Sequence, residues 1–319
     1  TALSYRADTY RPPGSYLIEW TASDGRAAPP RCYDPHRIRS ESQFTFTGNN
    51  MKNRYLAALA ACGLAPALAL SQTLPLHTTS GGDLGVEVYG YAYDTDRNGT
   101  SDVALTGRKL GLTGSFTKAL EQGWFWGMDG RYASGGTTFT SSTIGSNSGS
   151  TETLLDLRLL AGKDVVAGSH VLAPYTGLGY RAVHSQLTGY TTLGYISPTR
   201  KTTQFYIPIG LTYRTAASPT ARIATTFEAD YLLNGTQQTR YTEIAGYISD
   251  LNVSQKRGYG LRLNVAYETA RWSAGVFFQF WNIAESEIGT YADTSTVYTA
   301  TEAANITRIS GIQVKYRFD

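Results

Sequence analysis

The chain closes with the stretch GIQVKYRF at residues 311–318. Apolar side chains alternate there with polar and charged ones: Ile312, Val314, Tyr316 and Phe318 against Gln313, Lys315 and Arg317. Successive side chains of a β-strand point to opposite faces, so the stretch predicts a strand with one apolar and one charged face. The pattern suits a membrane-facing strand and a half-buried strand of a soluble β protein equally well. The rest of the chain has to separate these alternatives.

About ten segments have the length that a tilted membrane strand needs, and in most of them one parity is apolar. They lie at 84–93, 106–116, 123–133, 153–163, 171–182, 204–214, 221–233, 258–268, 271–282 and 306–318. The opposite parity carries charged residues: Glu87, Lys109, Asp129, Arg131, Asp156, Arg158, Arg181, Arg214, Arg222, Glu228, Asp230, Arg262, Glu268, Lys315 and Arg317. Alternation alone does not say which face is outside.

The links between these segments alternate in length. Long links at 94–105, 134–152, 183–203, 234–257 and 283–305 take turns with tight links at 117–122, 164–170, 215–220 and 269–270. Outer-membrane barrels have short periplasmic turns and longer extracellular loops, whereas a soluble sandwich has no reason to segregate loop length in this way. The sequence therefore predicts an all-β fold: a single antiparallel up-and-down transmembrane β-barrel of about ten strands, with eight or twelve as alternatives. Both barrel termini are expected in the periplasm.

Two segments, APYTGLGYR at 173–181 and YIPIGLTYR at 206–214, resemble strands of the small bacterial outer-membrane β-barrel superfamily, which includes porin-like, outer-membrane-protein-A-like and opacity-type barrels. The chain ending, with Gly311, Val314, Tyr316 and Phe318, resembles the C-terminal signal of the outer-membrane assembly machinery. The resemblance implies a Gram-negative outer membrane, with membrane lipid, lipopolysaccharide and the assembly machinery as partners. It says little about function, because the superfamily contains anchors, adhesins, narrow channels and a few enzymes.

A segment near the start of the chain predicts export. Residues 51–71 look like a signal peptide, with basic Lys52 and Arg54, an apolar run at 55–68 and small residues before a cleavage site near 70. A lipid attachment motif ending at Cys62 is the less favoured alternative. Residues 1–50 are expected to be an unstructured or upstream, non-native extension, and 72–319 the barrel. That barrel has no cysteine, which excludes disulfides and thiolate metal sites within it.

A barrel of about ten strands is barely wider than its own side chains, whereas open aqueous pores take about 16 to 18 strands. The charged parity is therefore predicted to form a network of ion pairs inside the lumen: Glu87, Lys109, Asp129, Arg131, Asp156, Arg158, Arg181, Arg214, Arg222, Glu228, Asp230, Arg262 and Glu268. We expect a plugged barrel with a structural or adhesin-like, surface-interaction role. A narrow or gated passive channel for small solutes is the first alternative, and a surface-rim hydrolase is the second.

The long links offer binding chemistry, because exposed tyrosines give large contact area at low entropic cost. They carry Tyr190, Tyr195, Tyr241, Tyr247, Tyr291 and Tyr298, which predict a surface ligand. The Ser, Gly and Thr-rich segment at 134–151 is instead expected to be flexible.

Metal, cofactor and catalytic signals are weak. Asp94, Asp96, Asn98 and Asp102 match half of a calcium loop, but Leu105 stands where a bidentate acid belongs, so a polar turn explains them as well. None of His77, His170 and His184 has an aspartate beside it or two residues before it. We expect no cofactor and no enzyme activity. A net charge of +3 is too small to indicate a nucleic-acid partner.

Overall fold

The structure is a computed structural model that describes residues 73–97 and 100–318. The predicted extension at 1–50 and signal peptide at 51–71 lie outside the described residues. Ten long strands make the sheet: β1 (Gly81–Arg97), β2 (Thr100–Ala119), β3 (Trp124–Ser141), β4 (Gly145–Lys163), β6 (His170–Gln186), β7 (Arg200–Ser218), β8 (Ala221–Thr239), β10 (Gly258–Thr269), β11 (Trp272–Ile283) and β14 (Ala304–Phe318). The shorter elements are β5 (Val165–Ala167), β9 (Leu251–Gln255), β12 (Gly289–Ala292), β13 (Val297–Ala300) and the 3-10 turns η1 (Glu121–Gly123) and η2 (Tyr241–Glu243).

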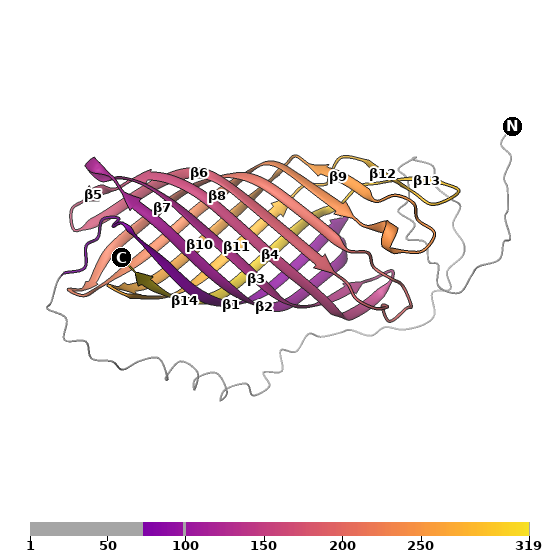
Figure 1. Ribbon diagram of the computed structural model, residues 1–319, viewed down its shortest axis with the longest axis horizontal. Coiled ribbons are helices and arrows are strands. Elements are labelled where there is room, and N and C mark those ends of the chain that lie inside the picture. Colours follow the sequence, from indigo (N-terminus) through magenta and orange to yellow (C-terminus); the bar gives the residue numbers. More distant parts are fainter. Residues whose placement is uncertain (1–72, 98–99, 319) are drawn as a thin grey trace, which may run out of the picture. The chain divides into compact units, whose positions relative to one another are not determined.

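The ten long strands close on themselves as an antiparallel up-and-down barrel (Figure 1). Each pairs with its neighbours along the chain, β10 also pairs with β8, and β14 lies between β11 and β1. Tyr316 of β14 stands opposite both Leu84 and Trp272, so the last strand closes the ring. The predicted fold and the predicted number of strands are therefore confirmed.

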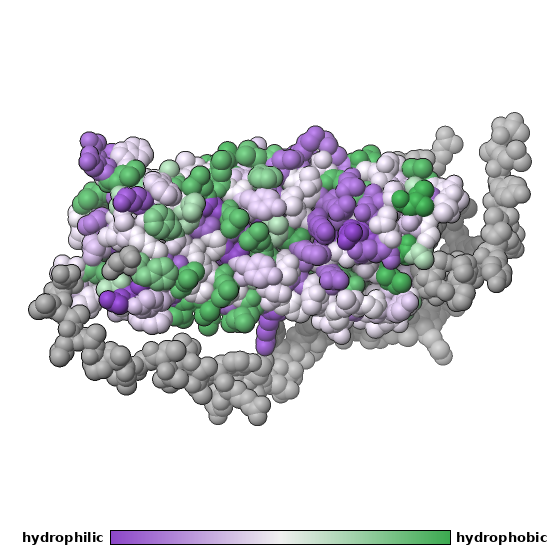
Figure 2. All heavy atoms as spheres, in the orientation of Figure 1, coloured by the Kyte–Doolittle hydropathy of each residue, from purple (hydrophilic) through white to green (hydrophobic). Residues whose placement is uncertain are grey.

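The two faces of the sheet have opposite chemistry. On β1 the side chains of Leu84, Val86 and Val88 are 61, 52 and 48% exposed, whereas those of Glu87 and Tyr89 between and after them are buried. Hydrophobic side chains are spread over the barrel wall in the same way (Figure 2). Since apolar side chains point out and charged ones point in, the outer wall needs an apolar surrounding such as lipid. Among the described residues, no helix is long and apolar enough to cross a membrane.

The barrel has two different ends. We call the end with the tight turns after β2, β4, β7 and β10 the turn end, and the opposite end the hairpin end (Figure 1). The long links at the hairpin end contain more strand than the sequence suggested. In the link at 134–152, β3 and β4 continue as a hairpin with only 142–144 between them.

The expectation that 134–151 is flexible was therefore wrong. Thr137, Phe139 and Ser141 point inward and are buried, and the segment is paired residue by residue with β4. Threonine and phenylalanine suit a half-buried pleated surface, so this composition supports a strand as well as a linker.

Candidate functional site

A network of charged and phenolic side chains crosses the middle of the lumen. Arg262 of β10 is its centre: its guanidinium donates from Nε to Asp230 Oδ2 at 2.7 Å and from Nη1 to Asp156 Oδ2 at 2.7 Å. The Nη2 of the same guanidinium donates to the hydroxyl of Tyr206, also at 2.7 Å. One arginine thus connects β10 with β8, β4 and β7.

Arg158 of β4 makes a second set of links. Its Nε and Nη2 donate to the two oxygens of Asp129 at 2.7 and 2.9 Å, a forked contact that fixes the guanidinium plane. Its Nη1 donates to Glu228 at 2.6 Å. We call the connected set the central network: Asp129, Asp156, Arg158, Tyr175, Tyr206, Glu228, Asp230 and Arg262.

The two tyrosines of the central network donate further hydrogen bonds to acids that the two arginines also bind. Tyr175 donates to Glu228 Oε2 at 2.7 Å, and Tyr206 donates to Asp156 Oδ1 at 2.6 Å. Glycines make room for both rings: a Cβ on Gly179 would lie 2.1 Å from Tyr206, and one on Gly210 would lie 2.2 Å from Tyr175. Small residues on β6 and β7 therefore position the phenols that complete the network.

Aromatic rings cover the central network on the side of the hairpin end. Trp281 meets the Tyr206 ring edge-on at 5.2 Å, and the guanidinium of Arg181 lies 5.3 Å from the Trp281 ring. Arg181 was predicted to pair with an acid, but its Nη1 donates to the amide oxygen of Gln204 at 2.9 Å instead. Among the described residues, no carboxylate lies within salt-bridge distance of Arg181.

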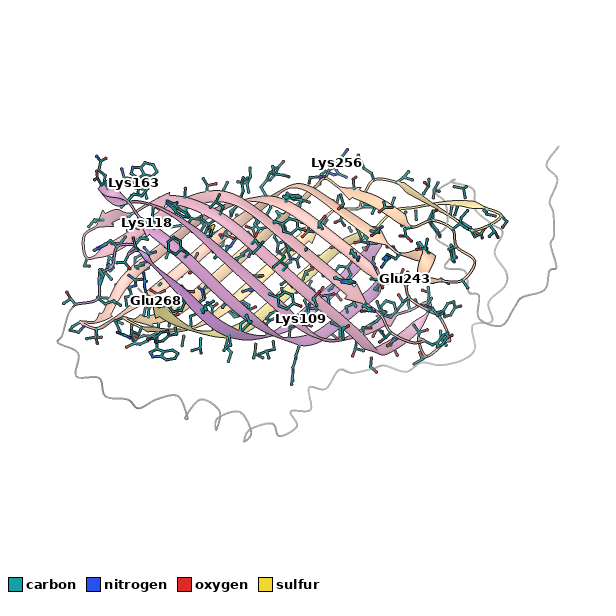
Figure 3. The ribbon with its side chains drawn as sticks, in the orientation of Figure 1. Lys109, Lys118, Lys163, Glu243, Lys256 and Glu268 are labelled. Carbon is teal, nitrogen blue, oxygen red and sulfur yellow. The ribbon has the colours of Figure 1, made fainter. Side chains whose placement is uncertain are left out.

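All thirteen predicted lumen residues are buried or half-buried, and those outside the central network, except Arg181, form local ion pairs. Arg131 lies 2.9 Å from Glu87, and Arg222 lies 2.6 Å from Glu268, which Figure 3 places at the turn end. Lys109 pairs with Glu152, and Arg214 lies 3.3 Å from Asp164.

Several partners of the predicted lumen residues were not themselves predicted. Glu152 shares the inward parity of Asp156, and Tyr206 shares that of Gln204, so alternation pointed to both. Asp164 follows β4 directly and belongs to a tight turn, where no parity rule applies. Sequence reasoning placed it in a link and so missed it.

Residues 74–80, which we call the strap, cross the turn end of the lumen. Backbone and side-chain bonds hold them: the Leu74 amide donates to the Pro219 carbonyl at 2.8 Å, and the Thr78 hydroxyl donates to Asp164 Oδ1 at 2.9 Å. Three arginines anchor the strap from different strands. Arg222 donates to the Pro75 carbonyl, Arg214 to the Thr78 hydroxyl and Arg317 to the Thr79 carbonyl.

A polar cavity of about 280 Å³ lies in the turn-end half of the lumen. Its lining extends from Arg214 and Glu268, near the strap, to Arg158 and Arg262 of the central network. A smaller cavity of about 40 Å³ lies towards the hairpin end, between residues such as Glu152, Arg181 and Gln255.

The hairpin end carries a cleft of about 380 Å³, which we call the hairpin-end cleft. Apolar and aromatic side chains make much of its wall: Phe139, Ile144, Tyr195, Tyr241 and Leu251. Hydroxyl groups are interspersed among them: Ser141, Thr143, Ser197 and Thr239. Arg200 and Glu302 pair at the lining, where Tyr93 donates to Glu302 at 2.9 Å.

Four of the predicted loop tyrosines form one stack beside this cleft: Tyr241, Tyr247, Tyr291 and Tyr298, called the tyrosine cluster. The Tyr241 and Tyr291 rings stack at 4.2 Å, and those of Tyr291 and Tyr298 at 5.1 Å. Leu251 and Val253 of β9 pack with them. Burial raises the pKa of Tyr291 above its usual value, and its neighbour Tyr241 adds to this effect. The cluster fixes Tyr241 as one wall of the cleft.

The calcium interpretation finds no support in the residues that the structure describes. Asp94 binds Arg308 at 2.8 Å, and Asp102 accepts a bond from the Ser142 hydroxyl at 3.1 Å. Asn98 and the side chain of Asp96 lie outside the described set. Nowhere in residues 73–97 and 100–318 do three His, Cys, Asp or Glu side chains group as metal ligands.

The chain ending predicted as an assembly signal forms the closing strand. In β14, Gly311, Val314 and Tyr316 pair with β1 on one side and with β11 on the other, and Phe318 is exposed at the end of the strand. Tyr316 meets the Trp272 ring at 4.9 Å.

No protein-family model and no curated protein matches this chain. Its fold is similar to that of the outer membrane protease OmpT from Escherichia coli, with a TM-score of 0.50 and 11% identity over 78% of this chain and 100% of that one. The outer membrane protein OprG from Pseudomonas aeruginosa is also similar (TM-score 0.34, 10% identity, 76% of this chain and 98% of that one). So is Ail, the attachment invasion locus protein of Yersinia pestis (TM-score 0.27, 10% identity, 75% and 99%).

At such low identity the likeness concerns the fold alone. It confirms the resemblance to bacterial outer-membrane β-barrels that the segments at 173–181 and 206–214 indicated.

Proposed function

We propose that the protein is an outer-membrane barrel with a closed lumen that binds a ligand at the cell surface through the hairpin-end cleft. The tight turns would face the periplasm and the hairpin end the exterior, as in other barrels of this type. The apolar outer wall supports the membrane location. The signal-like segment at 51–71 supports export of the chain.

The packing in the middle of the lumen supports a closed barrel. Arg158 and Arg262 each hold acids from two other strands, and Trp281 covers them on one side. Ions would have to displace guanidinium groups that are already paired, and leaving a buried charge unpaired costs several kcal/mol. This arrangement supports a structural role for the lumen.

The observation that carries the binding role is the hairpin-end cleft itself. It combines aromatic walls with hydroxyl groups, and the tyrosine cluster holds one wall in place. Concave sites lined mainly by apolar groups with a few polar ones are typical of ligand pockets. We propose an adhesin-like role in which a small, uncharged, amphipathic part of a surface molecule enters the cleft.

The proposal assigns no catalytic function. His170 bonds to Thr215 and Tyr213, and His184 is exposed on β6. In the described part of the chain neither has a carboxylate partner within bonding distance that would orient it as a general base. A narrow channel remains the second candidate, favoured by the polar cavity of about 280 Å³ above the strap.

Binding of protein-loaded liposomes to immobilised matrix proteins and to a glycan array tests the binding role. Ser197→Trp should fill the cleft, since Ser197 is buried in its lining. Leu193→Trp is the matched control on the same link, because Leu193 is 58% exposed and does not line the cleft. We expect the wild type and the control to bind one partner alike, and Ser197→Trp to lose at least about tenfold in affinity. No binding, or equal binding by all three, would refute the role.

A further inference from the structure

The outer wall of β14, β1 and β2 changes its chemistry near the hairpin end. The outward residues of β1 have large apolar side chains up to Val88. The next two outward residues are the small Gly90 and Ala92. Arg108 of β2 stands opposite Gly90, and Arg308 of β14 stands opposite Ala92. Two outward arginines thus flank a strip of β1 whose outer face carries no side chain larger than a methyl group.

These arginines stand at the border of the apolar wall. The next outward residues towards the turn end are Leu110 on β2 and, past Ser310, Ile312 on β14, which are 65 and 50% exposed. Beyond Arg108 the next outward residue of β2 is the small, polar Thr106, and beyond Ala92 the next outward residue of β1 is Asp94. Such a border is where a lipid head group meets its acyl chains.

A groove of about 670 Å³ runs along this border. Gly90, Ala92 and Ser310 are part of its lining, together with both arginines. Phe278 and Phe280 of β11 form an apolar wall, standing opposite Ser310 and Arg308 in the sheet. The groove therefore offers positive charge, hydroxyl groups and an apolar side to one elongated molecule.

The charge of this groove is only partly compensated. The Arg308 guanidinium lies 2.8 Å from Asp94, and its side chain remains 56% exposed. Arg108 is exposed and has no hydrogen bond or ion pair with any residue in the described part of the chain. An arginine without a partner among the described residues, next to Leu110 on a lipid-facing wall, is unfavourable, and an anionic head group would remove this cost.

We propose that this groove binds the phosphorylated head group of lipopolysaccharide, with Arg108 and Arg308 holding a phosphate and an acyl chain lying against Phe278 and Phe280. Arginine suits this task because its planar guanidinium donates two parallel bonds to phosphate oxygens. The choice of lipopolysaccharide over phospholipid rests on the proposed function, which places the hairpin end in the outer leaflet.

The test is equilibrium binding of purified full-length protein in detergent to three probes: bisphosphorylated lipid A, the same lipid without phosphates, and phosphatidylglycerol. Arg108→Gln should weaken binding of bisphosphorylated lipid A about tenfold, as expected for one charge-assisted phosphate contact. It should leave the dephosphorylated lipid unchanged within about twofold. Lys201→Gln is the matched control, since Lys201 is an exposed cation on β7, away from the groove.

Several results would overturn the proposal. Equal affinity for both forms of lipid A, or an equal loss in Lys201→Gln, would mean that Arg108 makes no specific phosphate contact. Phosphatidylglycerol binding as tightly and with the same Arg108 dependence would assign the groove to phospholipid, and competition by millimolar inorganic phosphate alone would indicate a free-anion site. Labelling of Leu193→Cys on intact cells by an impermeant maleimide tests the proposed orientation separately, because residues 73–319 contain no cysteine.

Discussion

The centre of the lumen and the hairpin-end cleft are both lined by tyrosines and polar groups, but they are packed differently. In the central network each guanidinium binds acids from two strands, and Tyr175 and Tyr206 donate further hydrogen bonds to two of these acids. In the cleft the tyrosines stack on one another and leave about 380 Å³ open. Charged residues therefore fill the centre of the lumen, whereas aromatic residues border open space at the hairpin end.

The largest effect should come from breaking the central network. Arg262→Ala leaves Asp156 and Asp230 without their shared partner in a buried site, which should lower the free energy of unfolding by about 3–5 kcal/mol. Urea titration of the protein folded into liposomes measures this difference. Lys256→Ala is the control: it removes the exposed pair with Glu287 and should cost less than about 1 kcal/mol. Similar costs for both variants would contradict a closed, interdependent lumen.

The second effect tests which face of the wall meets lipid. Leu263 and Asn264 are neighbours on β10, and Leu263 points outward whereas Asn264 accepts a bond from Gln313 inside. Leu263→Arg should cost about 2–4 kcal/mol if it lies near the bilayer midplane. Asn264→Asp, in the polar cavity, should cost clearly less in the same titration. A larger loss for the Asn264 variant would reverse the assignment of the two faces.

The smallest effect concerns pH at the hairpin end. Because burial raises the pKa of Tyr291 in the folded protein above the unfolded value of about 10, the fold favours its neutral form. This contribution is fully present below pH 10 and is lost as the pH rises through the folded pKa. We expect tyrosinate absorbance to show a late-ionising group that Tyr291→Phe removes and Tyr190→Phe, at a 64% exposed ring, does not. If Tyr291→Phe instead removed a tyrosine that ionises near pH 10, the ring of Tyr291 would not be held in the tyrosine cluster.

Much of the barrel was predictable from the sequence, because the alternation of apolar and polar residues along each strand fixes which side chains share a face. The charged parity from Glu87 to Glu268 points inward as expected, and the tight links mark one end. The partners inside were not predictable, because Arg158 meets Glu228 70 residues away and Arg262 meets Asp156 106 residues away. Such pairs depend on strand register and barrel closure, which alternation leaves open.

The hairpin-end cleft escaped prediction for a related reason. Its lining comes from four different links, which contribute Phe139, Tyr195, Tyr241 and Ala300. None of these links contains a sequence motif that is typical of a binding pocket. Tyrosine content indicated binding chemistry, but only the folded hairpins show which tyrosines stack and which border open space.

Planar-bilayer conductance tests the closed lumen most directly. The wild type should show little steady conductance, because the bonded side chains of the central network and the strap lie across the lumen. Arg158→Ala leaves Asp129 without its partner and takes one of two arginines away from Glu228, so this variant should show more. A large, stable conductance of the wild type would contradict the closed lumen and make the protein a channel.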